Sequence, residues 1–206
     1  EAGTITVGGT AGCKLSSSAS VSSGDNTVTL SASGGDKEYR CTITFTDAAG
    51  NIAVALALSP FKLDRTASAP TEQTAVVTPT NDATPNVVIK TSEAGTIAVG
   101  GTAGCELSSS ASVSSGVNTV SLSASGGDKE YNCTITFSDR SGNTASALAL
   151  SPFILDTTVS APTEQTPVLT PTNDATPNVV IKTSEAGTIS VGGTTGCGLS
   201  SSATVS

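Results

Sequence analysis

The chain has 206 residues, carries a formal net charge of −8 at pH 7, and contains no His, Met or Trp. An acidic surface repels phosphate backbones and anionic lipid headgroups, which argues against nucleic acid and membrane as partners. Only 3% of the residues are aromatic, so the composition also argues against an enzyme with a deep apolar pocket.

Internal repetition is the most informative feature of the sequence. The motif EAGTI begins at Glu1, Glu93 and Glu185, and residues 1–92 match residues 93–184 at 77 of 92 positions. Pro- and Thr-rich stretches at residues 63–74 and 155–166 indicate linkers, because proline favours extended, unpaired backbone. We therefore expect one complete module at residues 66–157, the C-terminal part of a module at 1–65, and the N-terminal part of the next at 158–206. On this reading the chain is a segment of a longer repeat protein.

Within residues 66–157 the apolar side chains recur with period two, which predicts strands with one polar face. In chain order, the expected strands lie near residues 74–78, 87–89, 97–99, 120–124, 131–138 and 145–156. In the last of these the inward parity changes between Leu150 and Phe153, so we expect a bulge or strand switch at Ser151-Pro152. With turn signals roughly every 8 to 12 residues, about seven strands fit an all-β sandwich.

The five cysteines follow the repeat. Cys105 and Cys133 share the inward parity of their strands, and the same spacing of 28 residues separates Cys13 from Cys41. Cys197 is the first member of a further pair, whose partner falls outside the segment. A zinc site needs about four ligands in short clusters, and a reactive thiol needs a nearby base; the sequence has no such cluster and no His.

These observations favour one disulfide in each module, with free core thiols as the alternative. Closing a loop of this length removes about 3.5 kcal/mol of unfolded-chain entropy, which is a large part of the stability of a small domain. Disulfides persist outside the reducing cytosol, so the prediction also implies an extracellular protein.

Four sequence blocks carry a family resemblance: TPTNDATPNVVIKTSEAGTI at residues 78–97, NTVSLSA at 118–124, YNCTITFSDRSGN at 131–143 and LSPFILDTT at 150–158. Their order, with the D-x-x-G-N step followed by a strand ending in L-D-x-T, resembles the Ig-like repeats of giant bacterial cell-surface proteins and adhesins. The resemblance implies tandem β-sandwiches strung as a rod or stalk and exported to the bacterial cell surface. Some members of that family bind calcium near module junctions through Asp-rich sites.

The candidate calcium ligands are Asp64 and Asp156 at the linkers, with Asp82 and Asp174 in the first inter-strand loop. Calcium takes six to eight oxygen ligands, and each junction here has few carboxylates, so the alternative is solvated or turn-capping carboxylates. The D-x-x-G-N steps at residues 47–51 and 139–143 are typical of tight turns. No cofactor other than calcium is indicated.

Three functions of different kinds are compatible with these patterns. The first is a structural spacer that projects or connects other modules, with neighbouring repeats of the same chain as its partners. The second is a subunit segment of an extracellular filament, formed by lateral self-association or by strand complementation; residues 185–206, however, duplicate residues 1–22, which a recipient module would not need. The third is a calcium- or glycan-binding module. Because the many serines lack a histidine base, we expect no enzyme activity.

Overall fold

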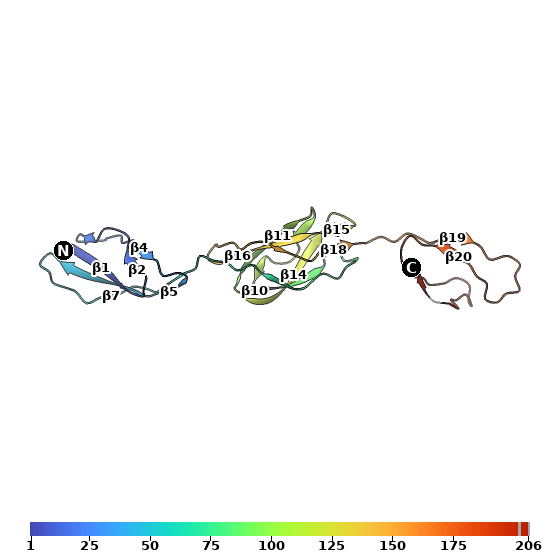
Figure 1. Cartoon of the computed structure of the whole chain (residues 1–206), viewed down its shortest axis with the longest axis horizontal. Coiled ribbons are helices and arrows are strands. Elements are labelled where there is room, and N and C mark those ends of the chain that lie inside the picture. Colours follow the sequence, from blue (N-terminus) through green and yellow to red (C-terminus); the bar gives the residue numbers. More distant parts are fainter. Residues whose placement is uncertain (202, 206) are drawn as a thin grey trace.

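The computed structural model describes residues 1–201 and 203–205, and these residues lie in strands, turns and irregular segments. Figure 1 shows three groups of strands in a row along the long axis, joined by extended segments. We call residues 1–65, 66–157 and 158–206 the first, second and third units; residues 202 and 206 of the third unit lie outside the described residues. The described part of the chain contains no helix of the length and apolarity that a bilayer span requires.

The second unit contains two four-stranded sheets whose paired strands are antiparallel. The first sheet has the order β12 (Cys105–Leu107), β14 (Gly116–Ala124), β10 (Asn86–Thr91) and β9 (Thr71–Thr74). The second has the order β13 (Ser112–Val113), β11 (Gly95–Gly101), β16 (Cys133–Asp139) and β17 (Leu148–Ala149). A separate pair is formed by β15 (Lys129–Tyr131) and β18 (Phe153–Leu155). The all-β prediction is therefore confirmed.

The core of the second unit lies between these sheets. Strand β16 alternates buried and half-buried positions, and it buries Cys133, Ile135 and Phe137. From the other sheet, β10 contributes Val87 and Ile89 to the same cluster of buried residues. The period-two pattern in the sequence thus identified the inward faces correctly.

Two predictions near the ends of the second unit, the break at Ser151-Pro152 and the first strand at 74–78, had different outcomes. The break at Ser151-Pro152 is confirmed, because β17 ends before it and pairs with β16, whereas β18 begins after it and pairs with β15. The first strand was misplaced: β9 ends at Thr74, and the chain then changes sheets. Thr80 pairs in parallel with Leu155, and its N–H donates to the carbonyl of Ile154 at 2.9 Å. The expected strand at 74–78 covers the segment in which the chain crosses from one sheet to the other. The alternation of apolar residues along this segment does not indicate such a crossing.

The first unit repeats the second at an offset of 92 residues, but without counterparts of β9 and β10. Its strands are β1 (Gly3–Gly9), β2 (Cys13–Leu15), β3 (Ser20–Val21), β4 (Leu30–Ala32), β5 (Lys37–Tyr39), β6 (Cys41–Asp47), β7 (Leu56–Ala57) and β8 (Phe61–Leu63). The third unit has the counterparts of β9 and β10, namely β19 (Thr163–Thr166) and β20 (Val180–Lys182), followed by β21 (Gly187–Thr188) and β22 (Thr204–Val205).

The 15 differences between residues 1–92 and 93–184 all fall at positions that are exposed or half-buried in residues 93–184. The residues that form the core of the second unit are therefore unchanged between repeats. The differences alter charge and surface polarity, as where Lys62 is replaced by Ile154, and Asp25 by Val117.

Candidate functional site at the junction of the first two units

The end of the second unit that meets the first unit is formed by two turns. One joins β10 to β11 and contains Glu93; the other follows β16 and begins at Asp139. Because β11 and β16 pair with Gly95 opposite Asp139, the two turns lie side by side. Residues 62–64, close to the end of the first unit, also lie at this end.

The Asp139 turn is built by the aspartate itself. Its Oδ1 accepts hydrogen bonds from the N–H of Ser141 at 2.8 Å and of Asn143 at 2.9 Å, and its Oδ2 accepts one from Nδ2 of Asn143 at 2.8 Å. Gly142 has φ of +89°, which glycine adopts without steric cost. The hydrogen bond from the Asn143 side chain is the largest cause that lowers the pKa of Asp139. The turn prediction for D-x-x-G-N is therefore confirmed.

Three carboxylates from the two units come together here. One ligand oxygen each from Asp64, Glu93 and Asp139 can be chosen so that all lie within 4.8 Å of one another. Nδ2 of Asn143 also donates to the backbone carbonyl of Asp64 at 3.0 Å, which fixes the end of the first unit to the turn of the second. Lys62 places Nζ 3.1 Å from Oδ2 of Asp64.

Lys62 supplies the positive charge for this acidic group. The pKa of Lys62 is raised, first by its hydrogen bond to Asp64 and then by the charge on Asp64, with Glu93 and Asp139 adding smaller contributions. Three carboxylates provide fewer than the six to eight oxygens of a calcium site, and those of Asp139 already accept hydrogen bonds. The residues present therefore form a hydrogen-bonded contact between units, beside an ion pair of the first unit, and do not by themselves complete a calcium site.

The four predicted calcium ligands, Asp64, Asp82, Asp156 and Asp174, do not gather at the junctions as the calcium hypothesis requires. Of the four, only Asp64 belongs to a group of three metal-ligating side chains in residues 1–201 and 203–205. Asp82 instead accepts hydrogen bonds from the N–H and hydroxyl of Thr84, at 2.8 and 3.1 Å, and Asp174 does the same with Thr176, at 2.8 and 3.3 Å. Asp156 accepts a long hydrogen bond of 3.4 Å from the N–H of Thr158. Asp82 and Asp174 therefore act as turn-capping carboxylates, which was the alternative interpretation from the sequence.

The sequence reasoning missed Glu93, Asp139 and Lys62 as members of one site. The signal was present in the strand register, because pairing Gly95 with Asp139 brings the TSEAG turn beside the D-x-x-G-N turn. That register depends on the pairing of two strands that are distant in sequence, which periodicity alone does not give.

A repeated carboxylate also fixes the start of each linker to its own unit. Asp36 accepts hydrogen bonds from the N–H and Nε of Arg65, at 3.0 and 3.1 Å, and from the hydroxyl of Thr66 at 3.0 Å. In the second unit, Asp128 accepts from the hydroxyls of Thr157 and Thr158, at 2.7 and 3.0 Å. These hydrogen bonds lower the pKa of both aspartates, and Arg65 is the main cause for Asp36. The linkers therefore leave their units in a defined direction.

The disulfide prediction is confirmed for both pairs that the chain contains. Cys13 is bonded to Cys41 and Cys105 to Cys133, with Cα–Cα distances of 5.8 and 5.7 Å. In the second unit the bond joins β12 of one sheet to β16 of the other, so it ties the two sheets together. Cys197 is an exposed free thiol in the structure, and its pairing outside the segment stays a prediction.

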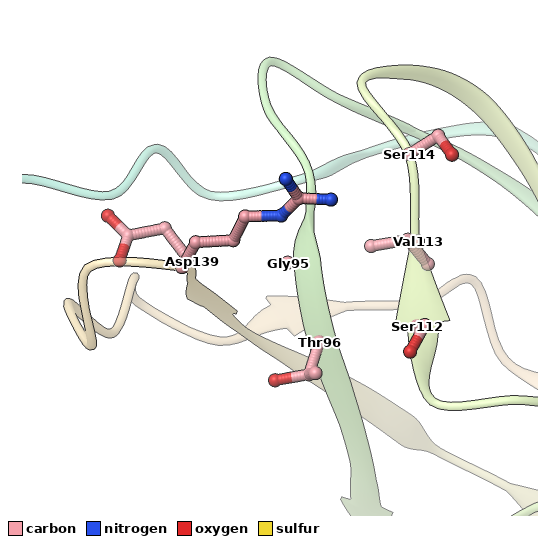
Figure 2. Close-up of a pocket in the computed structure, with 7 residues that line it drawn as sticks. Gly95, Thr96, Ser112, Val113, Ser114 and Asp139 are labelled. Atoms are coloured by element: carbon pink, nitrogen blue, oxygen red, sulfur yellow. The ribbon is translucent and has the colours of Figure 1, made fainter.

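A shallow hollow of about 300 Å³ lies beside the Asp139 turn. It is lined by Gly95, Thr96, Ser112, Val113, Ser114, Asp139 and Arg140. Figure 2 shows that the Asp139 carboxylate points away from Val113 and Ser114, so it does not face the serine hydroxyls across the hollow. The sequence has no histidine to act as their base.

No protein-family model matches the sequence, and no curated protein matches it either.

Proposed function

We propose that the chain is a spacer segment of a large extracellular bacterial repeat protein, an adhesin or surface fibre, in which tandem Ig-like sandwiches project or connect other modules. The observation that carries the proposal is the end-to-end arrangement, in Figure 1, of units cut from a near-identical 92-residue repeat. A row of units whose repeat keeps its core positions unchanged, joined by short, anchored linkers, adds length without requiring a binding pocket.

The strand pairing supports the Ig-like part of the proposal. In the second unit, β10 pairs with β14 in one sheet, and β11 pairs with β16 in the other. An Ig-like sandwich likewise pairs its second strand with its fifth and its third with its sixth, across two sheets that enclose one core. The disulfide joins the sheets around that core.

The two disulfides support an extracellular location. Reduced glutathione and thioredoxin keep cytosolic thiols reduced, so structural disulfides indicate an oxidising compartment. Placement at a bacterial cell surface is part of our proposal and follows from the resemblance to surface repeats.

The junction contacts support a semi-rigid spacer. The side chain of Asn143 donates a hydrogen bond to the backbone carbonyl of Asp64, the charges of Glu93 and Asp139 act on Lys62, and Ala67 at the start of the second unit packs against its core. The run from Lys129 to Asp139 spans 11 residues, or about 36 Å at roughly 3.3 Å per residue. Each repeat therefore adds a few nanometres of reach.

Small-angle scattering of the full chain tests the proposal. An end-to-end row predicts an elongated particle, whereas a compact chain of this length has a radius of gyration of about 17 Å. A measured value near 17 Å for the monomer would contradict the spacer.

Pulling the chain in single-molecule force spectroscopy gives a second readout. Cys105 and Cys133 are 28 residues apart in sequence, and their disulfide keeps the chain between them from extending. Unfolding of the second unit should therefore release about 10 nm more contour length when reductant is present.

A further inference from the structure

The chain enters and leaves the second unit through two segments that run side by side in the same direction. We call residues 66–80 the entry segment and residues 151–158 the exit segment. Thr80 of the entry segment pairs in parallel with Leu155 of the exit segment. Figure 1 shows the neighbouring units on opposite sides of the second unit along the long axis. A pull along the row of units therefore draws the two segments past each other in opposite directions.

Within the described residues, five hydrogen bonds join the entry segment directly to the exit segment. Two of them are between backbone groups: the N–H of Thr80 donates to the carbonyl of Ile154, and the N–H of Asp156 donates to the carbonyl of Thr80, both at 2.9 Å. In a third, the N–H of Ile154 donates to Oγ1 of Thr78, also at 2.9 Å. These three bonds lie together at the point where the chain crosses between the sheets.

The other two hydrogen bonds are made by Glu72 of β9. The N–H and hydroxyl of Ser151 donate to its Oε2, at 3.0 and 2.8 Å. Ser151 lies in the break between β17 and β18, so this contact ties β9 of one sheet to the place where the chain leaves the other sheet.

The position of Glu72 is unusual for a carboxylate. It lies opposite Ile89, which is fully buried, so its side chain is on the inward face of the sheet. Its Oε1 is buried and accepts no hydrogen bond from the described residues. Because an inward carboxylate is costly unless it is hydrogen-bonded, burial alone does not explain a glutamate here. The tie to Ser151 does explain it.

We propose that these five hydrogen bonds form a mechanical clamp that sets the resistance of the second unit to a pull along the chain. Because the two segments slide in parallel, the bonds run across the direction of the pull and share the force, so they cannot be broken one at a time from an end. The proposal rests on the proposed spacer function only in assigning tension to the chain; the clamp itself is a property of residues 66–157.

The disulfide has a different part in this picture. Cys105 and Cys133 belong to neither segment, and they lie between the two along the chain. Their bond therefore limits how far the chain extends after the clamp has opened, whereas the hydrogen bonds between the segments set the force at which it opens.

The repeat keeps the side chains that the clamp uses. Glu72, Thr78 and Ser151 correspond at an offset of 92 residues to Glu164, Thr170 and Ser59. Ile154 contributes only backbone groups to the clamp, and its counterpart is a different residue, Lys62. The positions whose side chains take part are thus the same in both copies, and the position that takes part through its backbone differs.

Unfolding of the full chain at constant force, without reductant, tests the proposal. Extension of residues 66–157, apart from the loop closed by the disulfide, releases roughly 20 nm of contour length, which identifies the second unit. Thr78→Val keeps the shape of an exposed side chain but removes the acceptor for Ile154, and we expect its unfolding rate under force to rise about twofold to tenfold. Glu72→Ala removes the acceptor of both bonds from Ser151 and should raise the rate about tenfold or more.

Thr91→Val is the matched control, because it makes the same substitution outside both segments. Thr91 is 1% exposed, and its Oγ1 donates to the carbonyl of Ser114 at 2.7 Å. Loss of this bond should lower the urea midpoint more than Thr78→Val does, yet change the unfolding rate under force by less than about twofold.

Two results would overturn the clamp. One is an unfolding rate under force that Thr78→Val leaves unchanged, because another contact would then resist the pull. The other is an equal acceleration by Thr78→Val and Thr91→Val, which would show that force reports only overall stability. Thr78→Val alone decides the question if Glu72→Ala does not fold. A compact particle in scattering would contradict the spacer without altering these rates, so the two proposals can fail separately.

Discussion

Removing the disulfide of the second unit is the most direct test of how this fold is stabilised. The double variant Cys105→Ala/Cys133→Ala removes the bond without leaving an unpaired thiol in the core. Both cysteines are buried, and they belong to β12 and β16 in different sheets. Without the bond, the two sheets are held by side-chain packing alone.

The expected cost follows from the size of the loop. The bonded residues are 28 apart in sequence, and the chain-entropy relation gives about 3.6 kcal/mol at 25 °C for a loop of that length. Small domains are typically stable by about 5 to 15 kcal/mol, so the variant loses a large fraction of its stability. For a unit of this size the melting temperature falls by about 15 to 30 °C.

Calorimetry measures the loss, and hydrogen exchange read by mass spectrometry assigns it to a unit. We expect the amides of β10, β14 and β16 to lose protection together. Cys13→Ala/Cys41→Ala is the matched control, because it removes the equivalent bond from the first unit and leaves the second unit intact. A loss below about 1 kcal/mol in the second unit would show that packing, rather than the covalent link, accounts for its stability.

Three further predictions concern single side chains. Tyr131→Phe removes a hydroxyl that donates to the carbonyl of Gly127 and accepts from the N–H of Gly126, and urea denaturation should show a loss of about 1 to 2 kcal/mol. Lys62→Ile, which installs the residue found at 154, leaves the three junction carboxylates without their ammonium group; spin-label distances between the first two units should broaden, and 1 M salt should reduce the difference from wild type. The lowered pKa of Asp139 contributes stability that is present above its ordinary value of 3.8 and is lost as the pH falls through the lowered pKa. The melting temperature should therefore decrease below about pH 4, and less steeply in Asp139→Asn; an equally steep decrease would exclude this carboxylate as a cause.

The sequence predicted most of the strands because each has one buried face. The alternation around Ile135 and Phe137 identified β16, and the parity of Cys105 and Cys133 placed both sulfurs in one core. Local patterns succeed here because burial of alternate side chains is a property of each strand on its own. The same reasoning located the break at Ser151-Pro152.

The sequence failed where position depends on a partner that is distant along the chain. The expected strand at 74–78 was displaced because the chain crosses between sheets before Thr80, which pairs in parallel with Leu155. The junction was only partly predicted for the same reason. Asp64 was identified from its place in the linker, but Glu93 and Asp139 join it only through the pairing of β11 with β16.

The differences between repeats are confined to positions outside the buried core. All 15 differences avoid buried positions, so the strands and cores of the repeats are interchangeable. Interchangeable strands allow pairing with the wrong repeat, because the core cannot distinguish correct partners from incorrect ones. Discrimination must then come from surface positions such as Asp25 and Lys62, where the repeats differ in charge. The surface, rather than the core, therefore determines which units meet and how firmly each junction is held.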